Sequence, residues 1–181
     1  QPFGFENVST RTLDGIKAIF HEALSPSEAV ARILKDVRTG GDKALISWNS
    51  RLDNREDPEL LVPGLELENA VKSLPDIKLE ALRYSIERIK AFHSRQPAGS
   101  WINQSNGGTM GQLLRPIQRV GIYVPGGTAP LPSSVLMSVV PAQVAGVQEI
   151  VICSPPDRTT GKISPVTLAA VSLVGVNEIY A

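Results

Sequence analysis

The residues best suited to bind a ligand lie where an apolar run ends in a glycine turn. Val120–Val124 has the pattern of a short β-strand, Pro125-Gly126-Gly127 predicts a turn, and an apolar helical pattern begins near Ser133. A strand, a glycine turn and a helix in this order can direct backbone N–H groups and a helix N-terminus at an anion such as phosphate. The spacing is not G-x-G-x-x-G, so these two glycines alone are weak evidence for a nucleotide.

Tyr123 is the side chain of this segment whose position suggests binding. It lies at the end of the β run, immediately before the turn. In open α/β sheets the ligand crevice forms at the carboxyl ends of parallel strands. Position alone leaves two interpretations open, a ligand contact and ordinary packing.

The other groups able to bind a metal or act as a nucleophile are scattered. Neither His21 nor His93 has a histidine or cysteine at a spacing typical of zinc ligands. His21 is interpreted as a helix-surface or capping residue, and His93 as a partly buried side chain with one hydrogen-bond partner. Cys153, which ends an apolar β run, is interpreted as an ordinary buried thiol. We therefore predict no catalytic residue and no metal ligand in this chain.

Composition excludes several functions. The 181 residues include 18 Lys and Arg against 18 Asp and Glu, which gives no electrostatic case for nucleic acid or an anionic membrane. No apolar run approaches the roughly 20 residues of a membrane span. One cysteine rules out an internal disulfide framework and fits a reducing compartment. We expect a cytoplasmic protein, and a transit segment removed earlier would leave no trace.

Charge is distributed unevenly along the chain. Residues 1–100 carry 14 basic and 15 acidic side chains, whereas residues 101–181 carry 4 and 3. The first part therefore predicts amphipathic helices, and the second predicts apolar elements of a sheet flanked by helices. We divide the chain into a mainly helical region, 1–110, and a Rossmann-like α/β region, 111–181, with Trp48 and Trp101 as core or domain-junction residues.

Helix signals organise the first region. Ser25 and Glu28 have the spacing of a capping box, and Gly40-Gly41 ends the helix that follows. Further on, Pro75 separates two more amphipathic helices.

The second region alternates between β and helical patterns. The segments 120–124, 149–153 and 177–181 read as β runs, and 133–147 and 164–173 as helices. This β-α-β-α-β order predicts a parallel, Rossmann-like half sheet, with a kink or break at Pro141.

The block R-V-G-I-Y-V-P-G-G-T-A-P-L-P-S-S-V-L-M closely resembles the signature region of the histidinol dehydrogenases, the zinc- and NAD-dependent enzymes that complete histidine biosynthesis. The resemblance spans most of the chain but only the N-terminal portion of the family. We therefore expect the fold to be incomplete relative to the full enzyme, and the chain alone to be inactive. Four other segments resemble the family as well: 83–93, 115–119, 149–156 and 176–181.

The resemblance implies a function and a site. Family members oxidise L-histidinol through L-histidinal to L-histidine, as homodimers. The family tyrosine that contacts NAD corresponds to Tyr123, and Pro125, Gly126 and Gly127 form the adjoining turn. The residues that bind Zn²⁺, substrate and protons are expected outside this chain. Two alternatives remain: a related zinc- and NAD-dependent dehydrogenase of another small alcohol, and a non-catalytic α/β nucleotide-binding or interaction module.

Overall fold

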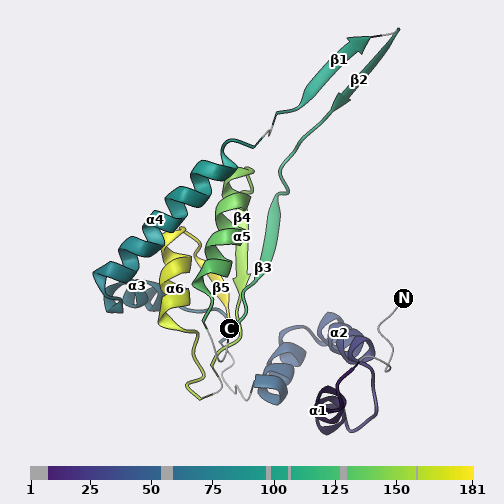
Figure 1. The fold of residues 1–181 in the computed structure, drawn as a ribbon. Helices are drawn as coiled ribbons and strands as arrows, with labels where there is room; N and C mark the ends of the chain where they lie inside the picture. Colours follow the sequence, from purple (N-terminus) through teal and green to yellow (C-terminus); the bar gives the residue numbers. More distant parts are fainter. Residues whose placement is uncertain (1–7, 54–58, 97–98, 106, 127–129, 158) are drawn as a thin grey trace. The chain divides into compact units, whose positions relative to one another are not determined.

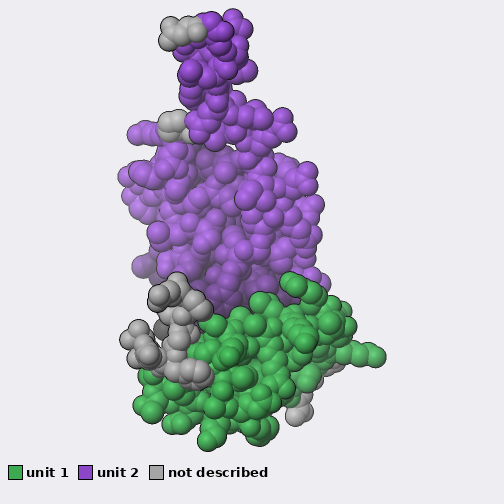
Figure 2. Space-filling model, turned by 90° about the vertical axis from the view of Figure 1, so that its right-hand side faces the viewer, with its two compact units in different colours: residues 1–60 green, residues 61–181 purple. Residues whose placement is uncertain are grey.

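The computed structural model describes residues 8–53, 59–96, 99–105, 107–126, 130–157 and 159–181. The chain forms two compact units, Gln1–Leu60 and Leu61–Ala181 (Figure 2). This division differs from the one predicted at residue 110. The reason is that the helices between residues 64 and 93 pack on the helices of the α/β region rather than forming a body with the first two helices.

The first unit is a small helical body. Helix α1 (Thr10–Phe20) contacts α2 (Pro26–Asp53), which breaks at Gly41, where φ is 57°. The core holds Phe20 and Trp48, whose ring centroids lie 5.0 Å apart, and the Arg51 guanidinium lies 4.3 Å from the Trp48 ring centroid. The break at Gly41 and the burial of Trp48 agree with the sequence.

The predicted capping box begins α2. The Glu28 carboxylate accepts hydrogen bonds from the Ser25 backbone N–H at 2.8 Å and from the Ser25 hydroxyl at 2.7 Å. The Glu28 N–H in turn donates to the Ser25 oxygen at 3.3 Å. These bonds satisfy N–H groups that the first helical turn leaves without intrahelical partners.

The second unit is built in three layers (Figure 1). Its sheet contains β3 (Arg119–Tyr123), β4 (Glu149–Cys153) and β5 (Glu178–Tyr180), paired in parallel in the order β3-β4-β5. Helices α5 (Pro132–Val144) and α6 (Pro165–Leu173) connect these strands. The predicted β-α-β-α-β half sheet is confirmed.

The outer layer comes from earlier in the chain. Helix α3 (Gly64–Ser73) packs on α6, and α4 (Asp76–His93) packs on α5. Leu67 and Leu82 of these helices belong to the same core as Ile152 of the central strand. Helices α5 and α6 cover one face of the sheet, and α3 and α4 pack on the outer side of α5 and α6.

Pro141 lies inside α5 without interrupting it, so the predicted break is wrong. The helix continues from Pro141 to Val144, and the Ala145 N–H donates to the Pro141 carbonyl at 2.9 Å. Pro141 stands in the last turn, where the missing N–H removes one intrahelical hydrogen bond and few residues remain to be displaced.

A hairpin occupies the segment that sequence patterns left unassigned. Strand β1 (Trp101–Ser105) pairs antiparallel with β2 (Gly108–Gln112), and the ribbon extends away from the helices of its unit (Figure 1). Trp101 is 51% exposed, so the expectation of a core or junction residue is wrong. The Trp101 indole N–H donates across the ribbon to Gln112 at 3.3 Å, and the ribbon provides no core to bury the ring.

The two faces of the sheet differ. Side chains alternate along a strand, so Ile122, Ile152 and Ile179 point into the core with α5 and α6. The opposite face carries Tyr123 and Cys153, both exposed, and no helix of this unit's described residues covers it. Among the described residues, no helix combines the length and apolarity needed to cross a membrane.

Candidate ligand site at the carboxyl edge of the sheet

The strands of the sheet end side by side, so the segments that follow β3 and β4 meet at one edge. Tyr123 pairs with Cys153, and Cys153 pairs with Tyr180. Two hydrogen bonds extend this alignment past the strand ends: Val124 N–H donates to the Cys153 carbonyl at 2.8 Å, and Ser154 N–H donates to the Tyr180 carbonyl at 3.0 Å. The turn after β3 is therefore held against the segment that follows β4.

Tyr123 presents its ring to solvent at this edge. The residue is 68% exposed, although it belongs to a strand whose next residue, Val124, is completely buried. The alternation of the strand explains the contrast, because Tyr123 points to the open face and Val124 points to the core. A ring this exposed contributes little to the core and is available to contact a ligand.

Gly126 is required by close packing rather than by an unusual backbone angle. A Cβ atom at this position would overlap the carbonyl oxygen of Pro155 and would lie 3.2 Å from the Ser154 Oγ atom. The turn therefore rests directly on the Ser154–Pro155 backbone, and only glycine fits there. Pro125 beside it is exposed, and Gly127 lies outside the described residues.

Beneath this turn lies a hydroxyl with no partner. Ser154 is 3% exposed, and its Oγ atom has no hydrogen bond in the structure. A buried polar group without a partner costs about 1–3 kcal/mol relative to one that is paired or solvated. Among the buried, fully inaccessible side-chain nitrogen and oxygen atoms of the described residues, this is the single unpartnered case.

The environment of Cys153 differs from the buried one that the sequence predicted. The residue is exposed rather than buried, because it points to the open face of the sheet. Partial desolvation by the surrounding sheet, with a smaller contribution from the Glu178 carboxylate, raises the pKa of the Cys153 thiol. The thiol is therefore mainly protonated near neutral pH and is a poor nucleophile.

The loop after β4 forms a tight turn around Asp157. The Asp157 carboxylate accepts the N–H groups of Thr159 at 2.9 Å and Thr160 at 3.0 Å. Backbone hydrogen bonds from Thr160 and Thr159 lower the pKa of Asp157. A cavity of about 660 Å³ lies between this loop and α3, and its lining residues include Asn69 and Lys162.

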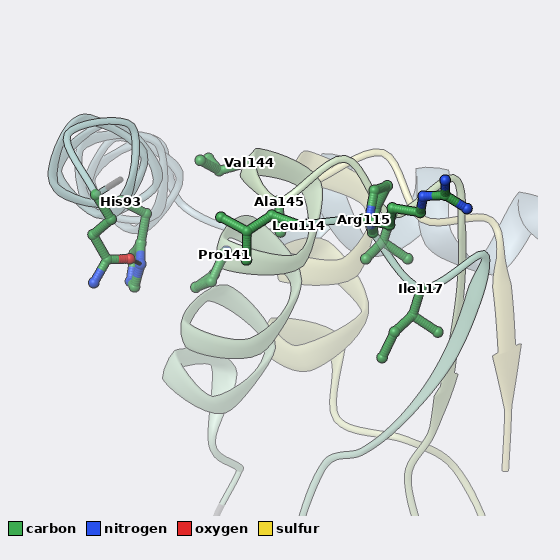
Figure 3. Close-up of a pocket in the computed structure, with 10 residues that line it drawn as sticks. His93, Leu114, Arg115, Ile117, Pro141, Val144 and Ala145 are labelled. Carbon is green, nitrogen blue, oxygen red and sulfur yellow. Dashed lines mark hydrogen bonds between the residues drawn. The ribbon is translucent and has the colours of Figure 1, made fainter. Parts of the chain in front are cut away.

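At the opposite edge of the sheet, where the strands begin, ion pairs link the three strands. Arg119 bonds Glu149 at 2.8 Å and Glu178 at 2.6 Å, and both partners raise the pKa of Arg119. A second hollow of about 530 Å³ lies near this edge, between the ends of α4 and α5 (Figure 3). His93 on its wall is partly buried, with its Nδ1 atom 2.7 Å from Gln96 Oε1, as the sequence predicted.

No set of three or more His, Cys, Asp or Glu side chains among the described residues is arranged to hold a metal ion. Zinc sites need three or four such ligands converging on one point. The described part of this chain therefore does not fit a zinc ion.

The sequence indicated most of this edge but missed Ser154. Tyr123 and Gly126 lie at the carboxyl edge of the sheet, as the strand-and-turn pattern predicted. The signal for Ser154 was alternation: Ile152 points to the core, so the residue two positions later does so as well. A serine on the core-facing side at a strand end is a candidate for a specific polar contact.

Taken together, a parallel half sheet, a close-packed glycine turn and an exposed tyrosine at its carboxyl edge define a Rossmann-like α/β unit. Comparison with known proteins is specific: residues 21–181 match the model of the histidinol dehydrogenase family. The chain belongs to this family.

Individual relatives agree. The chain is 43% identical over 173 residues to histidinol dehydrogenase of Deinococcus radiodurans, covering 96% of this chain and 39% of the relative. It is 42% identical over 154 residues to histidinol dehydrogenase of Bacillus subtilis, covering 84% and 36%. The crystal structure of histidinol dehydrogenase from Elizabethkingia anophelis matches with a TM-score of 0.80 at 32% identity, over 93% of this chain and 40% of that one. The chain thus spans about two-fifths of the length of these relatives.

Proposed function

We propose that the full-length gene product is a histidinol dehydrogenase and that this chain supplies the NAD side of its active site. The reaction is the oxidation of L-histidinol through L-histidinal to L-histidine. Family membership and the name shared by the relatives support the reaction. The exposed Tyr123 and the close-packed Gly126 at one edge of the sheet support the placement of the cofactor.

Each residue of the proposed site has a distinct role. The exposed Tyr123 ring contacts the cofactor by stacking or through its hydroxyl. Pro125 and Gly126 lie in the turn that lets the cofactor approach the backbone, and the close packing of Gly126 on Pro155 sets the position of that turn. The family resemblance adds Gly127 to this site. Bound NAD would accept one hydride in each of the two oxidation steps.

The remaining parts of the reaction are assigned elsewhere. The family resemblance places the zinc ligands and the acid–base residues outside this chain. We assign no nucleophilic role to Cys153, because partial desolvation raises the pKa of its thiol. The family resemblance further supports a cytoplasmic homodimer.

The observation that carries this proposal is an exposed tyrosine beside a glycine for which no larger residue can substitute, in a chain of this family. The test is the stoichiometry of NADH formation by the purified full-length gene product, with limiting L-histidinol and added zinc. We expect two NADH molecules for each histidinol consumed. Oxidation of other small alcohols but not of histidinol would replace this substrate, and no NADH with any alcohol would favour a non-catalytic module.

A further inference from the structure

The proposed function leaves the Ser154 hydroxyl unexplained. Buried polar groups in folded proteins are nearly always hydrogen-bonded, so a lone exception calls for a physical reason. A role in packing does not provide one, because alanine would fill most of the same space without burying a hydroxyl. The position supplies a better reason, since the Oγ atom lies under the turn at the ligand edge.

The start of α5 is the second relevant feature of this segment. No side chain caps the helix at Leu131, proline occupies its first turn, and no acidic residue lies in that turn. The positive end of the helix dipole is therefore not balanced by a carboxylate of its own first turn. Helix N-termini of this kind bind phosphate groups, and α5 is the helix that follows the Pro125–Gly126 turn in the sequence.

We propose that the Ser154 hydroxyl is the buried hydrogen-bond donor of a phosphate subsite at the Pro125–Gly126 turn. This inference rests on the proposed NAD site and assigns its pyrophosphate to that position. The cofactor brings the hydrogen-bond acceptor that Ser154 lacks in the free protein. Gly126 covers the hydroxyl without a side chain, so a small displacement of the turn opens it to a phosphate oxygen.

The test exploits an opposition between stability and binding in the full-length gene product. In Ser154→Ala, the orphaned hydroxyl is removed, so the melting temperature without NAD should stay the same or rise. The Kd for NAD should increase about tenfold, because a hydrogen bond to a charged phosphate is lost. A fall in melting temperature would show that the hydroxyl already has a partner in the free protein, and an unchanged Kd would remove it from the site.

A second buried serine provides the matched control. Ser25 is 7% exposed and is bonded to Glu28 in the capping box. Ser25→Ala should therefore lower the melting temperature and leave the Kd for NAD unchanged, the reverse of the pattern at Ser154. Equal effects of the two substitutions on NAD binding would overturn the proposal.

Inorganic pyrophosphate separates a phosphate subsite from the rest of the cofactor site. It should compete with NAD in the unmodified protein and compete about tenfold less well in Ser154→Ala. Absence of competition in the unmodified protein would overturn the assignment of phosphate to this position. Tyr123→Ala in the same assay separates failure of the phosphate subsite from failure of the proposed NAD site. If NAD binding depends on Tyr123 and not on Ser154, only the phosphate subsite is wrong. If it depends on neither, the proposed site fails as well.

Discussion

Substituting Gly126 by alanine perturbs the candidate site at its tightest contact. The new Cβ atom would overlap the Pro155 carbonyl oxygen, which belongs to the backbone and cannot rotate away. The turn must therefore shift, and overpacking of this kind costs about 1–3 kcal/mol. We expect the melting temperature of the full-length gene product to fall by roughly 3–10 °C. The Kd for NAD should rise as well, because the displaced turn follows Tyr123 directly.

Gly121, on strand β3 before this turn, provides the matched control. A Cβ atom there meets nothing within 4 Å, and its backbone φ is not positive. Gly121→Ala should be neutral or stabilise the protein by about 0.5 kcal/mol, because alanine loses less conformational freedom on folding. Thermal unfolding and NAD titration of both variants check the argument. Equal stability and equal NAD affinity in the two variants would refute the reasoning about close packing.

Three further predictions concern the fold and its titrating groups. The hydrogen bonds from Ser25 lower the pKa of Glu28 in the folded protein. The stabilisation they give is therefore fully present above the pKa that Glu28 has in the unfolded chain, and it is lost as the pH falls through the lower folded pKa. The stabilities of wild type and Glu28→Gln in acid unfolding should therefore converge at low pH. Ile152 is fully buried, so Ile152→Ala should cost about 2–5 kcal/mol in urea unfolding, whereas Ile102→Ala, at 78% exposure, should change stability by less than about 0.5 kcal/mol. Cys153 should react with iodoacetamide with a pH midpoint above that of free cysteine, and a midpoint below it would contradict the raised pKa.

Sequence patterns predicted the elements whose causes are local. The capping box at Ser25, the break at Gly41 and the interruption at Pro75 depend on residues within one helical turn, and the structure contains each of them. The β-α-β-α-β order followed from apolar periodicity together with the rules for parallel crossovers.

The features that sequence patterns missed depend on tertiary context. The hairpin at Trp101 contains glycines and polar residues without a clear alternation of apolar side chains, and its strands are identified by their pairing with each other. The exposure of Cys153 depends on which face of the sheet the helices cover. The unpartnered state of Ser154 depends on the backbone of Gly126 lying over it, a contact between two loops that no local pattern contains.

The central claim is that the cofactor crosses the carboxyl edge of the sheet at Tyr123. The most direct measurement is the pair of Michaelis constants for NAD and for histidinol in full-length Tyr123→Ala. Loss of a contacting aromatic ring should cost roughly 1–2 kcal/mol, which is about tenfold in the constant for NAD, with a much smaller change for histidinol. Tyr123→Phe should be milder if stacking dominates. An unchanged constant for NAD, together with a lower melting temperature, would show that Tyr123 is a packing residue and would contradict the account.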